Sequence, residues 1–494
     1  MITRRDALAL VAATAKGQEA SGKASEICFL TATELARRIR RKDLSAREVL
    51  AAHLRQIERV NPKVNAIVTL VAEQAVEQAK RLDEAAARKK FLGPLHGLPV
   101  AHKDLVETKG IRTTFGSPVF KDNVPAANAL MVDRIQVAGA VTIGKTNTPE
   151  LGAGSQTFNP VFGATRNPWD LSKTCGGSSG GAAVALACGM VPLADGSDMG
   201  GSLRNPASFC SVVGFRTSPG RVPRGPSDAA WNSLSVLGPM ARTVQDVALF
   251  LSAIAGPDTT SPLSIHEPGS RFAQPLERDC KGVRIAWCPK FGGLPFDRRI
   301  RDVFDSQRKK FATLGCITED ADPDFSGADE AFKVLRALSF YQQYGSLPGA
   351  QRRQMKDTIR QELDRGSRLT GPEIAAAETK RSRLFARMGQ LMEKHDFLLL
   401  PVTQVPAFDI QQEYVTEIEG TKMGSYIDWM RSCYFITVTA LPAISVPAGF
   451  TPEGLPVGVQ IVGRHQDDWG VLQIAHAFEQ VNGLKDKFPA VAAS

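Results

Sequence analysis

The amino-acid sequence predicts an α/β protein, in which a single large domain holds a central mixed β-sheet flanked by helices. From Gly93 onward, short apolar segments typical of buried strands alternate with helix-like segments, as expected for a sheet covered by helices. Two more apolar segments follow late in the chain, at 441–446 and 457–462. If both join the same sheet, the 494 residues form one large domain with its site loops gathered at a single edge.

The segment 31–87 is predicted to be helical. Thr31 with Glu34, and Ser45 with Glu48, fit the capping box, in which the first side chain and the glutamate satisfy each other's free backbone N–H groups. The second of these helices has its apolar residues on one face at helical spacing: Val49, Leu50, Leu54 and Ile57. We expect this segment to cover the sheet and to carry no reactive group.

Residues 1–30 are interpreted as an N-terminal extension that precedes the main domain, 31–494. Arg4 and Arg5 stand before a short apolar run that ends in Ala13-Thr14-Ala15, which resembles a truncated twin-arginine export signal with a cleavage site. The alternative is an amphipathic N-terminal helix. We expect a cytoplasmic protein, with export to the periplasm as the alternative.

Composition excludes several classes of protein. The net charge is +9 at pH 7, but the basic clusters lie in helix-like segments with acidic neighbours, which favours solvated helix faces over a nucleic-acid surface. No apolar run approaches the roughly 20 residues that cross a bilayer. The 8 cysteines form no CxxC pair, which indicates buried free thiols, and the 7 histidines include no HExxH motif, so no metal site is predicted.

The first strand expected after Gly93 carries a lysine that could act as a base. After the turn that begins at Gly93, a short strand is expected to carry Lys103, followed by a loop over 106–125. A helix over 129–138 and a buried strand over 140–143 come next. Lys103 follows apolar residues, so burial is expected to lower its pKa. An ion pair with Asp104 is the alternative interpretation.

The stretch 174–209 holds two serines among paired glycines. Ser178 lies in GGSSGG and Ser202 in GSDMGGSLR, 24 positions apart. The apolar segment between them, AAVALACGMVPLA, is predicted to be a buried helix followed by a short strand. Glycine pairs allow sharp turns, and a run such as Gly200-Gly201-Ser202 can direct successive N–H groups into one anion-binding hollow.

Two common motifs also match parts of the sequence. Residues 139–146 fit the phosphate-binding loop G-x-x-x-x-G-K-[ST], but the middle residues are strand-like and no long helix follows. Residues 176–180 fit G-x-S-x-G, the nucleophile elbow of α/β-hydrolases, although the preceding residues are polar and turn-like. A Ser–His hydrolase that uses Ser178 stays open as an alternative, because four histidines follow in the chain: His266, His395, His465 and His476.

The serine motifs and the lysine resemble the amidase signature family. The residues that carry the resemblance are PVAHKD at 99–104, CGGSSGG at 175–181 and GSDMGGSLR at 196–204. The resemblance extends over 92–256 and resumes at 441–463, while 258–430 is the least similar part and is interpreted as a helical region that shapes the substrate site. It implies the amidase signature fold.

The resemblance also implies a catalytic triad. Ser202 would attack the substrate carbonyl, and Ser178 would relay the proton to Lys103, with a cis peptide bond between Gly177 and Ser178. Ser179 would support the lysine through a hydrogen bond. The oxyanion hole would be formed by backbone N–H groups of Met199, Gly200, Gly201 and Ser202, and the loop would be held by the structural residues Asp198 and Arg204.

Two positions depart from the family pattern. Met199 stands where threonine is usual, but a backbone donor needs no particular side chain. Cys175 stands where proline is common, which would loosen the turn before GGSSGG. Neither departure removes a catalytic group.

The resulting prediction is an amidase that cleaves a carboxylic amide C–N bond, with esters, anilides and carbamates (urethanes) as further substrate classes. It needs no metal and no organic cofactor, takes a small-molecule substrate, binds neither nucleic acid nor membrane, and is compatible with a homodimer. Alternatives are the glutaminase subunit of a tRNA-dependent amidotransferase and a non-catalytic partner that has kept the fold. Candidates for the wall of an aryl or aliphatic pocket are Phe158, Trp231, Tyr341 and Tyr344, and a place in the core is the equal alternative for each.

Overall fold

An 11-stranded mixed sheet forms the centre of the protein in a computed structural model, which describes residues 26–493. The strand order is β1-β3-β2-β6-β8-β7-β14-β15-β11-β9-β10. The strands are β1 Ile67–Leu70, β2 Pro99–Lys103, β3 Val141–Thr146, β6 Leu193–Asp198, β7 Val213–Arg216, β8 Val236–Ala241, β9 Arg284–Trp287, β10 Ile317–Asp320, β11 Phe397–Pro401, β14 Ala443–Phe450 and β15 Pro456–Val462.

Both parallel and antiparallel neighbours occur in the sheet. The pairs β2–β3, β2–β6, β11–β9 and β10–β9 are parallel, and the other pairs are antiparallel. Two small hairpins lie outside it, formed by β4 Phe158–Asn159 with β5 Gly163–Ala164 and by β12 Glu417–Ile418 with β13 Thr421–Lys422. The predicted fold class, one α/β domain around a mixed sheet, is confirmed.

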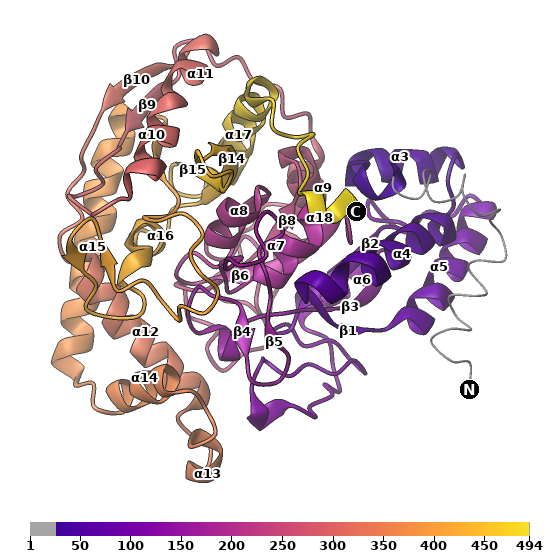
Figure 1. The fold of residues 1–494 in the computed structure, drawn as a ribbon, viewed down its shortest axis with the longest axis horizontal. Helices are drawn as coiled ribbons and strands as arrows, with labels where there is room; N and C mark the ends of the chain where they lie inside the picture. The colour runs from indigo at the N-terminus through magenta and orange to yellow at the C-terminus, as the bar shows by residue number, and fades with distance from the viewer. Residues whose placement is uncertain (1–25, 494) are drawn as a thin grey trace.

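Helices cover the sheet along its whole length (Figure 1). Near one end lie α3 Ala32–Arg41, α4 Ala46–Val64 and α5 Ala72–Ala87, and next along the chain come α6 Leu130–Val137, α7 Gly180–Ala187, α8 Arg204–Cys210 and α9 Val244–Ile254. The remaining helices are α10 Arg298–Ser306, α11 Arg308–Thr313, α12 Ala328–Tyr344, α13 Gly349–Arg352, α14 Asp357–Ser367, α15 Gly371–Lys394, α16 Arg431–Val438, α17 Asp468–Asn482 and α18 Ala490–Ala493.

The N-terminal helical cover forms as predicted, with two differences. The capping box of Ser45 and Glu48 is complete. At the other box, Thr31 caps its helix, but the Glu34 carboxylate pairs with arginines of the next turn instead of the Thr31 backbone. The segment also contains strand β1, which pairs with β3 at the edge of the sheet and interrupts the predicted helices.

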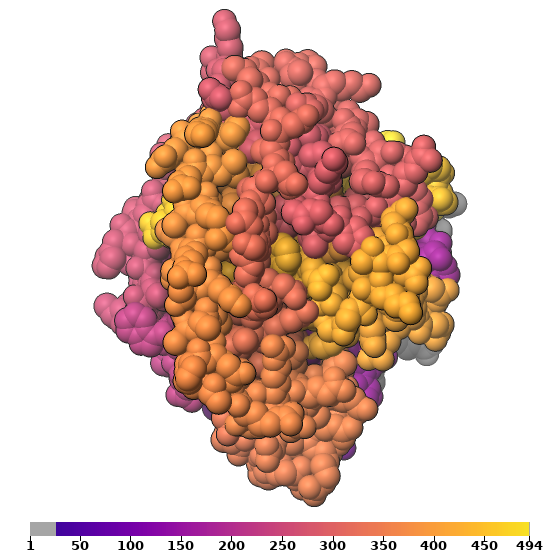
Figure 2. Space-filling view, turned by 90° about the vertical axis from the view of Figure 1, so that its left-hand side faces the viewer, coloured from indigo at the N-terminus to yellow at the C-terminus, as the bar shows by residue number. Residues whose placement is uncertain are grey.

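The region 258–430 is helical, as predicted, but it also supplies three strands. Strands β9, β10 and β11 extend the main sheet beyond β15, so this region is built onto the sheet and does not merely lie over it. Its helices α12, α14 and α15 group on one side of the molecule, and Figure 2 turns that side toward the viewer. The late strands β14 and β15 join the same sheet, as expected.

Apolar residues from distant parts of the chain form the core. Trp287 of β9 stacks on Phe304 of α10, with ring centroids 4.2 Å apart. Phe311 of α11 stacks on Phe478 of α17 at 4.7 Å. All eight cysteines are buried and free, which confirms the prediction of buried thiols. The twin-arginine-like motif lies outside the described residues.

Candidate active site

Lys103 ends strand β2 and points toward three serine hydroxyls. Its Nζ lies 2.7 Å from Ser178 Oγ, 2.9 Å from Ser179 Oγ and 3.1 Å from Ser197 Oγ. Because β2 and β6 are parallel neighbours, their carboxyl ends meet at the same edge of the sheet, and this brings Ser197 of β6 to the lysine. The sheet edge therefore gathers one basic side chain and three hydroxyl groups.

Burial sets the protonation behaviour of Lys103. The side chain is fully buried, which lowers its pKa to about 7, although Asp198 and Asp195 favour the charged form. A large fraction of the amine is therefore neutral near pH 7. The alternative ion pair with Asp104 does not form, because the Asp104 carboxylate accepts hydrogen bonds from the backbone N–H and the hydroxyl of Thr114.

Ser178 is presented by the loop before α7. A cis peptide bond joins Gly177 to Ser178, at the position that the family resemblance implied. The Gly177 carbonyl accepts a hydrogen bond of 2.7 Å from the Ser155 hydroxyl. The next residue, Ser179, donates its backbone N–H to the Ser202 carbonyl at 3.2 Å. This bond connects the two serine motifs directly.

Ser202 lies just before α8, in a loop that requires glycine at position 201. Gly201 has φ +114°, and an added Cβ would overlap the side chain of Cys433. The Gly201 N–H donates to Asp198 Oδ1 at 3.0 Å. It is therefore not free to bind a substrate oxygen, which differs from its expected place in the oxyanion hole. The backbone N–H groups of Gly200 and Ser202 have no acceptor among residues 26–493.

The Asp198 carboxylate holds this loop together. It accepts hydrogen bonds from Arg204 Nη2 at 2.9 Å, Arg204 Nε at 3.0 Å and the Leu203 N–H at 3.1 Å. Burial alone would raise the pKa of Asp198, but Arg204 and Arg216 outweigh it and hold this pKa well below its usual range. Arg204 reaches further, to the Cys433 carbonyl at 2.9 Å, and so connects the loop to α16.

Sequence reasoning missed Ser197 and Arg216. Arg216 Nη1 lies 3.2 Å from Asp198 Oδ1, and burial lowers the Arg216 pKa to about 10. A signal for Ser197 was present, because it stands within GSDMGGSLR next to Asp198. Arg216 ends an apolar strand, but nothing local to it indicates that the strand lies beside β8 and reaches this loop.

Ser178, Ser197 and Ser202 open into one cavity of about 450 Å³. A cavity of this size takes a small organic molecule. Apolar side chains form much of its wall, among them Leu105, Phe115, Met131, Leu151, Met199, Leu237, Phe332, Phe340, Ile427 and Met430. Charged groups reach it from Glu107, Arg224 and Arg336.

Only one of the four candidate pocket residues, Tyr344, lines this cavity. Trp231 is 77% exposed and Tyr341 is 40% exposed, so these two lie neither in the pocket nor in the core. Phe158 lies elsewhere, beneath the amine of Lys356 at 5.6 Å from the ring centroid. Aromatic residue type alone did not indicate which side chains face the cavity.

The two alternative motifs lack their structural contexts. The phosphate-loop match forms strand β3, and its lysine, Lys145, is buried and donates to the Val106 carbonyl and to Thr108 Oγ1. At the elbow match, no histidine within residues 26–493 hydrogen-bonds to Ser178, whose hydroxyl contacts Lys103. Of the later histidines, His395 contacts Glu319 and His476 contacts Gln480.

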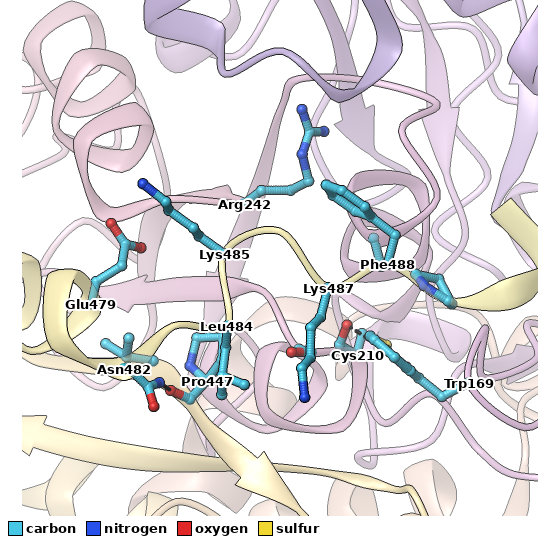
Figure 3. A pocket seen from close by; sticks show the side chains of 14 residues that line it. Trp169, Cys210, Arg242, Pro447, Glu479, Asn482, Leu484, Lys485, Lys487 and Phe488 are labelled. Atoms are coloured by element: carbon cyan, nitrogen blue, oxygen red, sulfur yellow. Dashed lines mark hydrogen bonds between the residues drawn. The ribbon is translucent and has the colours of Figure 1, made fainter. Parts of the chain in front are cut away.

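A second hollow lies apart from the serines, where the segment after α17 crosses the body of the protein (Figure 3). Arg242, Glu479 and Lys485 border it, and burial raises the pKa of Glu479 to about 8. Its volume of about 20 Å³ accommodates little more than one water molecule. This hollow is therefore too small for an organic substrate.

Two further properties concern residues 26–493 as a whole. They contain no group of three His, Cys, Asp or Glu side chains placed to hold a metal ion. None of their helices has the length and apolar character that a membrane crossing requires.

Comparisons with known proteins agree on one family. The amidase family pattern matches residues 48–472. An acylamidase from Rhodococcus erythropolis is 37% identical over 465 residues, covering 94% of this chain and 97% of the relative. A glutamyl-tRNA(Gln) amidotransferase subunit from Moorella thermoacetica is 36% identical over 479 residues, covering 92% of this chain and 97% of the relative.

Solved structures show the same likeness. A bacterial aryl acylamidase of the amidase signature family superposes with a TM-score of 0.87 at 28% identity, covering 94% of this chain and 99% of that one. A 6-aminohexanoate cyclic dimer hydrolase in complex with its substrate superposes with a TM-score of 0.85 at 26% identity, with the same coverage. The chain belongs to the amidase family. It is a hydrolase of amide C–N bonds.

Proposed function

We propose that this amidase cleaves small-molecule amides through an acyl-enzyme on Ser202, with Lys103 as the base and Ser178 as the proton relay. The observation that carries the proposal is the 2.7 Å contact between Lys103 Nζ and Ser178 Oγ, at a cavity that Ser202 also lines. A serine hydroxyl becomes a nucleophile only when a neighbouring base removes its proton. Lys103, with a pKa of about 7, is the base within reach.

The proposed reaction begins with proton transfer. Ser202 Oγ bonds to the carbonyl carbon while its proton passes to Ser178 Oγ and the Ser178 proton passes to neutral Lys103. The negative charge of the tetrahedral intermediate rests on the former carbonyl oxygen, where the N–H groups of Gly200 and Ser202 stabilise it, with Met199 as a further donor. Gly201 is left out of this set, because its N–H bonds to Asp198.

Collapse of the intermediate breaks the C–N bond. The proton held by Lys103 returns through Ser178 to the leaving nitrogen, which departs as a neutral amine. Water then attacks the acyl group on Ser202, and Lys103 takes the water proton through Ser178. As the bond between the acyl carbon and Ser202 Oγ breaks, this proton returns through Ser178 to Ser202 Oγ, and the carboxylic acid leaves. Ser179 and Ser197 position the amine of Lys103, while Asp198 and Arg204 hold the loop.

A stand-alone enzyme is proposed, active as a monomer or homodimer without nucleic acid or membrane. The apolar wall of the cavity suits anilides and other amides with an apolar group, and esters and carbamates (urethanes) share the acyl chemistry. The likeness to an amidotransferase subunit supports the second candidate, a glutaminase that works with another protein chain.

One substrate panel tests both candidates. Purified protein alone is assayed with an anilide, an aliphatic amide, a carbamate and glutamine, before and after exhaustive chelation. We expect anilide or aliphatic amide hydrolysis that chelation does not change, since every proposed reacting group belongs to the protein. Hydrolysis of glutamine alone, and only with a partner protein, would favour the amidotransferase role, while loss of activity with chelator would contradict the metal-free mechanism.

Cytoplasmic residence is proposed for the protein, with export as the alternative. The only support for export is the paired arginines and the Ala13-Thr14-Ala15 sequence. Cell fractionation and N-terminal sequencing decide between them: a periplasmic protein beginning at Lys16 would establish export and cleavage.

A further inference from the structure

The charges that line the catalytic cavity are not all balanced by protein groups. Arg336 is balanced, because its Nη1 lies 2.5 Å from Glu362 Oε1 and its Nη2 donates to the Tyr426 hydroxyl at 2.5 Å. Arg224, the other lining arginine, forms no ion pair with a described residue. Arg224 is therefore a lining guanidinium without an ion-pair partner among the described residues, and the Glu107 carboxylate at the same cavity does not pair with it.

Arg224 is held in place by neutral groups. Its Nη1 donates to the Ser235 carbonyl at 3.3 Å, and its backbone N–H donates to Ser261 Oγ at 3.4 Å. The side chain is partly buried, and burial lowers its pKa. A guanidinium stays protonated in proteins, so this one carries its charge at the cavity wall.

Tyr344 provides a second donor near Arg224. Both residues line the cavity. Burial raises the pKa of the Tyr344 phenol to about 12, and the positive charge of Arg224 opposes part of this rise. The Tyr344 hydroxyl has no hydrogen-bond partner among residues 26–493. The cavity therefore offers a cation and a neutral hydroxyl donor, both free to bind a ligand.

An uncompensated, partly buried cation is unfavourable unless a ligand supplies the opposite charge. A carboxylate is the matching group, since its two oxygens fit the planar guanidinium fork. The apolar side chains of the cavity wall would exclude water and strengthen the pairing.

We infer that the substrates are amides that carry a carboxylate, and that Arg224 binds this carboxylate and determines specificity. The inference rests on the proposed function, since it names the substrate class of the same cavity. Tyr344 donates a second hydrogen bond to the carboxylate. The carboxylate belongs to the acyl part or to the amine part of the substrate, and the experiment separates the two.

Two matched substrate pairs test the inference. On the acyl side, glutaryl 4-nitroanilide is compared with valeryl 4-nitroanilide, in which a methyl group replaces the carboxylate. On the amine side, 4-acetamidobenzoate is compared with 4-acetamidotoluene. For the wild-type protein we expect kcat/KM to be at least about tenfold higher for the carboxylate in one pair, the effect of a charge-assisted hydrogen bond.

Variants assign the preference to Arg224. Arg224→Met should lower the ratio at least about tenfold, mainly by raising KM for the carboxylated substrate, and Arg224→Lys should retain part of it. Arg298→Gln removes the same charge from an exposed position, where the side chain is 81% exposed, and should leave the ratio unchanged. If Arg224→Met does not fold, the wild-type and Arg224→Lys ratios decide the question.

A wild-type ratio near one in both pairs, or a ratio that Arg224→Met leaves unchanged, would overturn the inference while amide hydrolysis itself stands. Failure of the wild-type protein to hydrolyse any of the four amides would instead contradict the proposed function. The two failures are thus distinguishable in one experiment.

Discussion

Lys103 and Lys145 are both buried lysines near the ends of the adjacent parallel strands β2 and β3. In the strand register, Lys145 lies opposite His102, the residue before Lys103. Burial lowers the pKa to about 7 for Lys103 and to about 8 for Lys145. Only their neighbours differ: Lys103 meets three serine hydroxyls, whereas Lys145 meets a backbone carbonyl and one threonine.

This difference shows that a lowered pKa does not by itself identify a catalytic base. A base also needs a neighbour that can lose a proton toward it and a space for substrate beside that neighbour. Lys103 has both, since Ser178 is its hydrogen-bond partner and lines the cavity. Lys145 instead holds the chain that follows β2, through Val106 and Thr108.

Replacing Lys103 should have the largest effect. We expect Lys103→Ala to remain folded and to lower kcat/KM at least about 1,000-fold, or roughly 4 kcal/mol of barrier, because Ser202 loses its base. Lys145→Met, the matched variant, should retain at least a tenth of the wild-type value. Steady-state kinetics and thermal unfolding measure both. A folded Lys103→Ala protein with more than about a tenth of wild-type kcat/KM would place the base elsewhere.

The two members of the proton relay should act as a unit. The Lys103→Ala/Ser178→Ala double variant should therefore be little worse than the poorer single variant, because either change already interrupts proton transfer from Ser202. The measurement is kcat/KM for the two single variants and the double variant. Losses that multiply in the double variant would show that Lys103 and Ser178 contribute independently.

The pH dependence of kcat/KM is the next way to distinguish Lys103 from Lys145. The reactive form needs neutral Lys103, so kcat/KM should rise about tenfold per pH unit below the pKa of about 7 and level above it. The direction follows because protonation of Lys103 at low pH removes the proton acceptor. Lys145→Met should leave this rise in place. Its disappearance in that variant would assign the titration to Lys145, with its pKa of about 8.

Ser197→Ala should have the smallest effect. Lys103 keeps its shorter contacts with Ser178 and Ser179 and loses only the 3.1 Å contact. We expect a loss of about tenfold or less in kcat/KM. Because the Ser197 hydroxyl accepts a hydrogen bond from the amine and favours its charged form, the rise in activity should move to lower pH. A shift to higher pH would contradict the assigned role of Ser197.

The local elements could be predicted from the sequence because their signals are local, and the proposed catalytic residues were indicated by the family resemblance. The helix α7 and strand β6 follow from one apolar segment between the serine motifs, and Lys103 meets Ser178 and Ser179 as the resemblance implied. The cis bond between Gly177 and Ser178 is present where it was expected.

Long-range packing could not be predicted from the sequence. Strands β9, β10 and β11 are four or five residues long within a charged helical region, and their partners lie far along the chain. Arg204 reaches Cys433 and Gln460, which no local pattern indicates. Residue type made Trp231 a candidate for the pocket or the core, but tertiary packing leaves it at the surface.

The central claim, that Lys103 acts through Ser178 to activate Ser202, is tested most directly with a fluorophosphonate that forms an adduct with an activated serine. Mass mapping of the wild-type protein should find the adduct on Ser202, and its rate of formation should fall by orders of magnitude in Lys103→Ala but remain within tenfold in Lys145→Met. An adduct on Ser178, or one on Ser202 that forms equally fast in Lys103→Ala, would contradict the account.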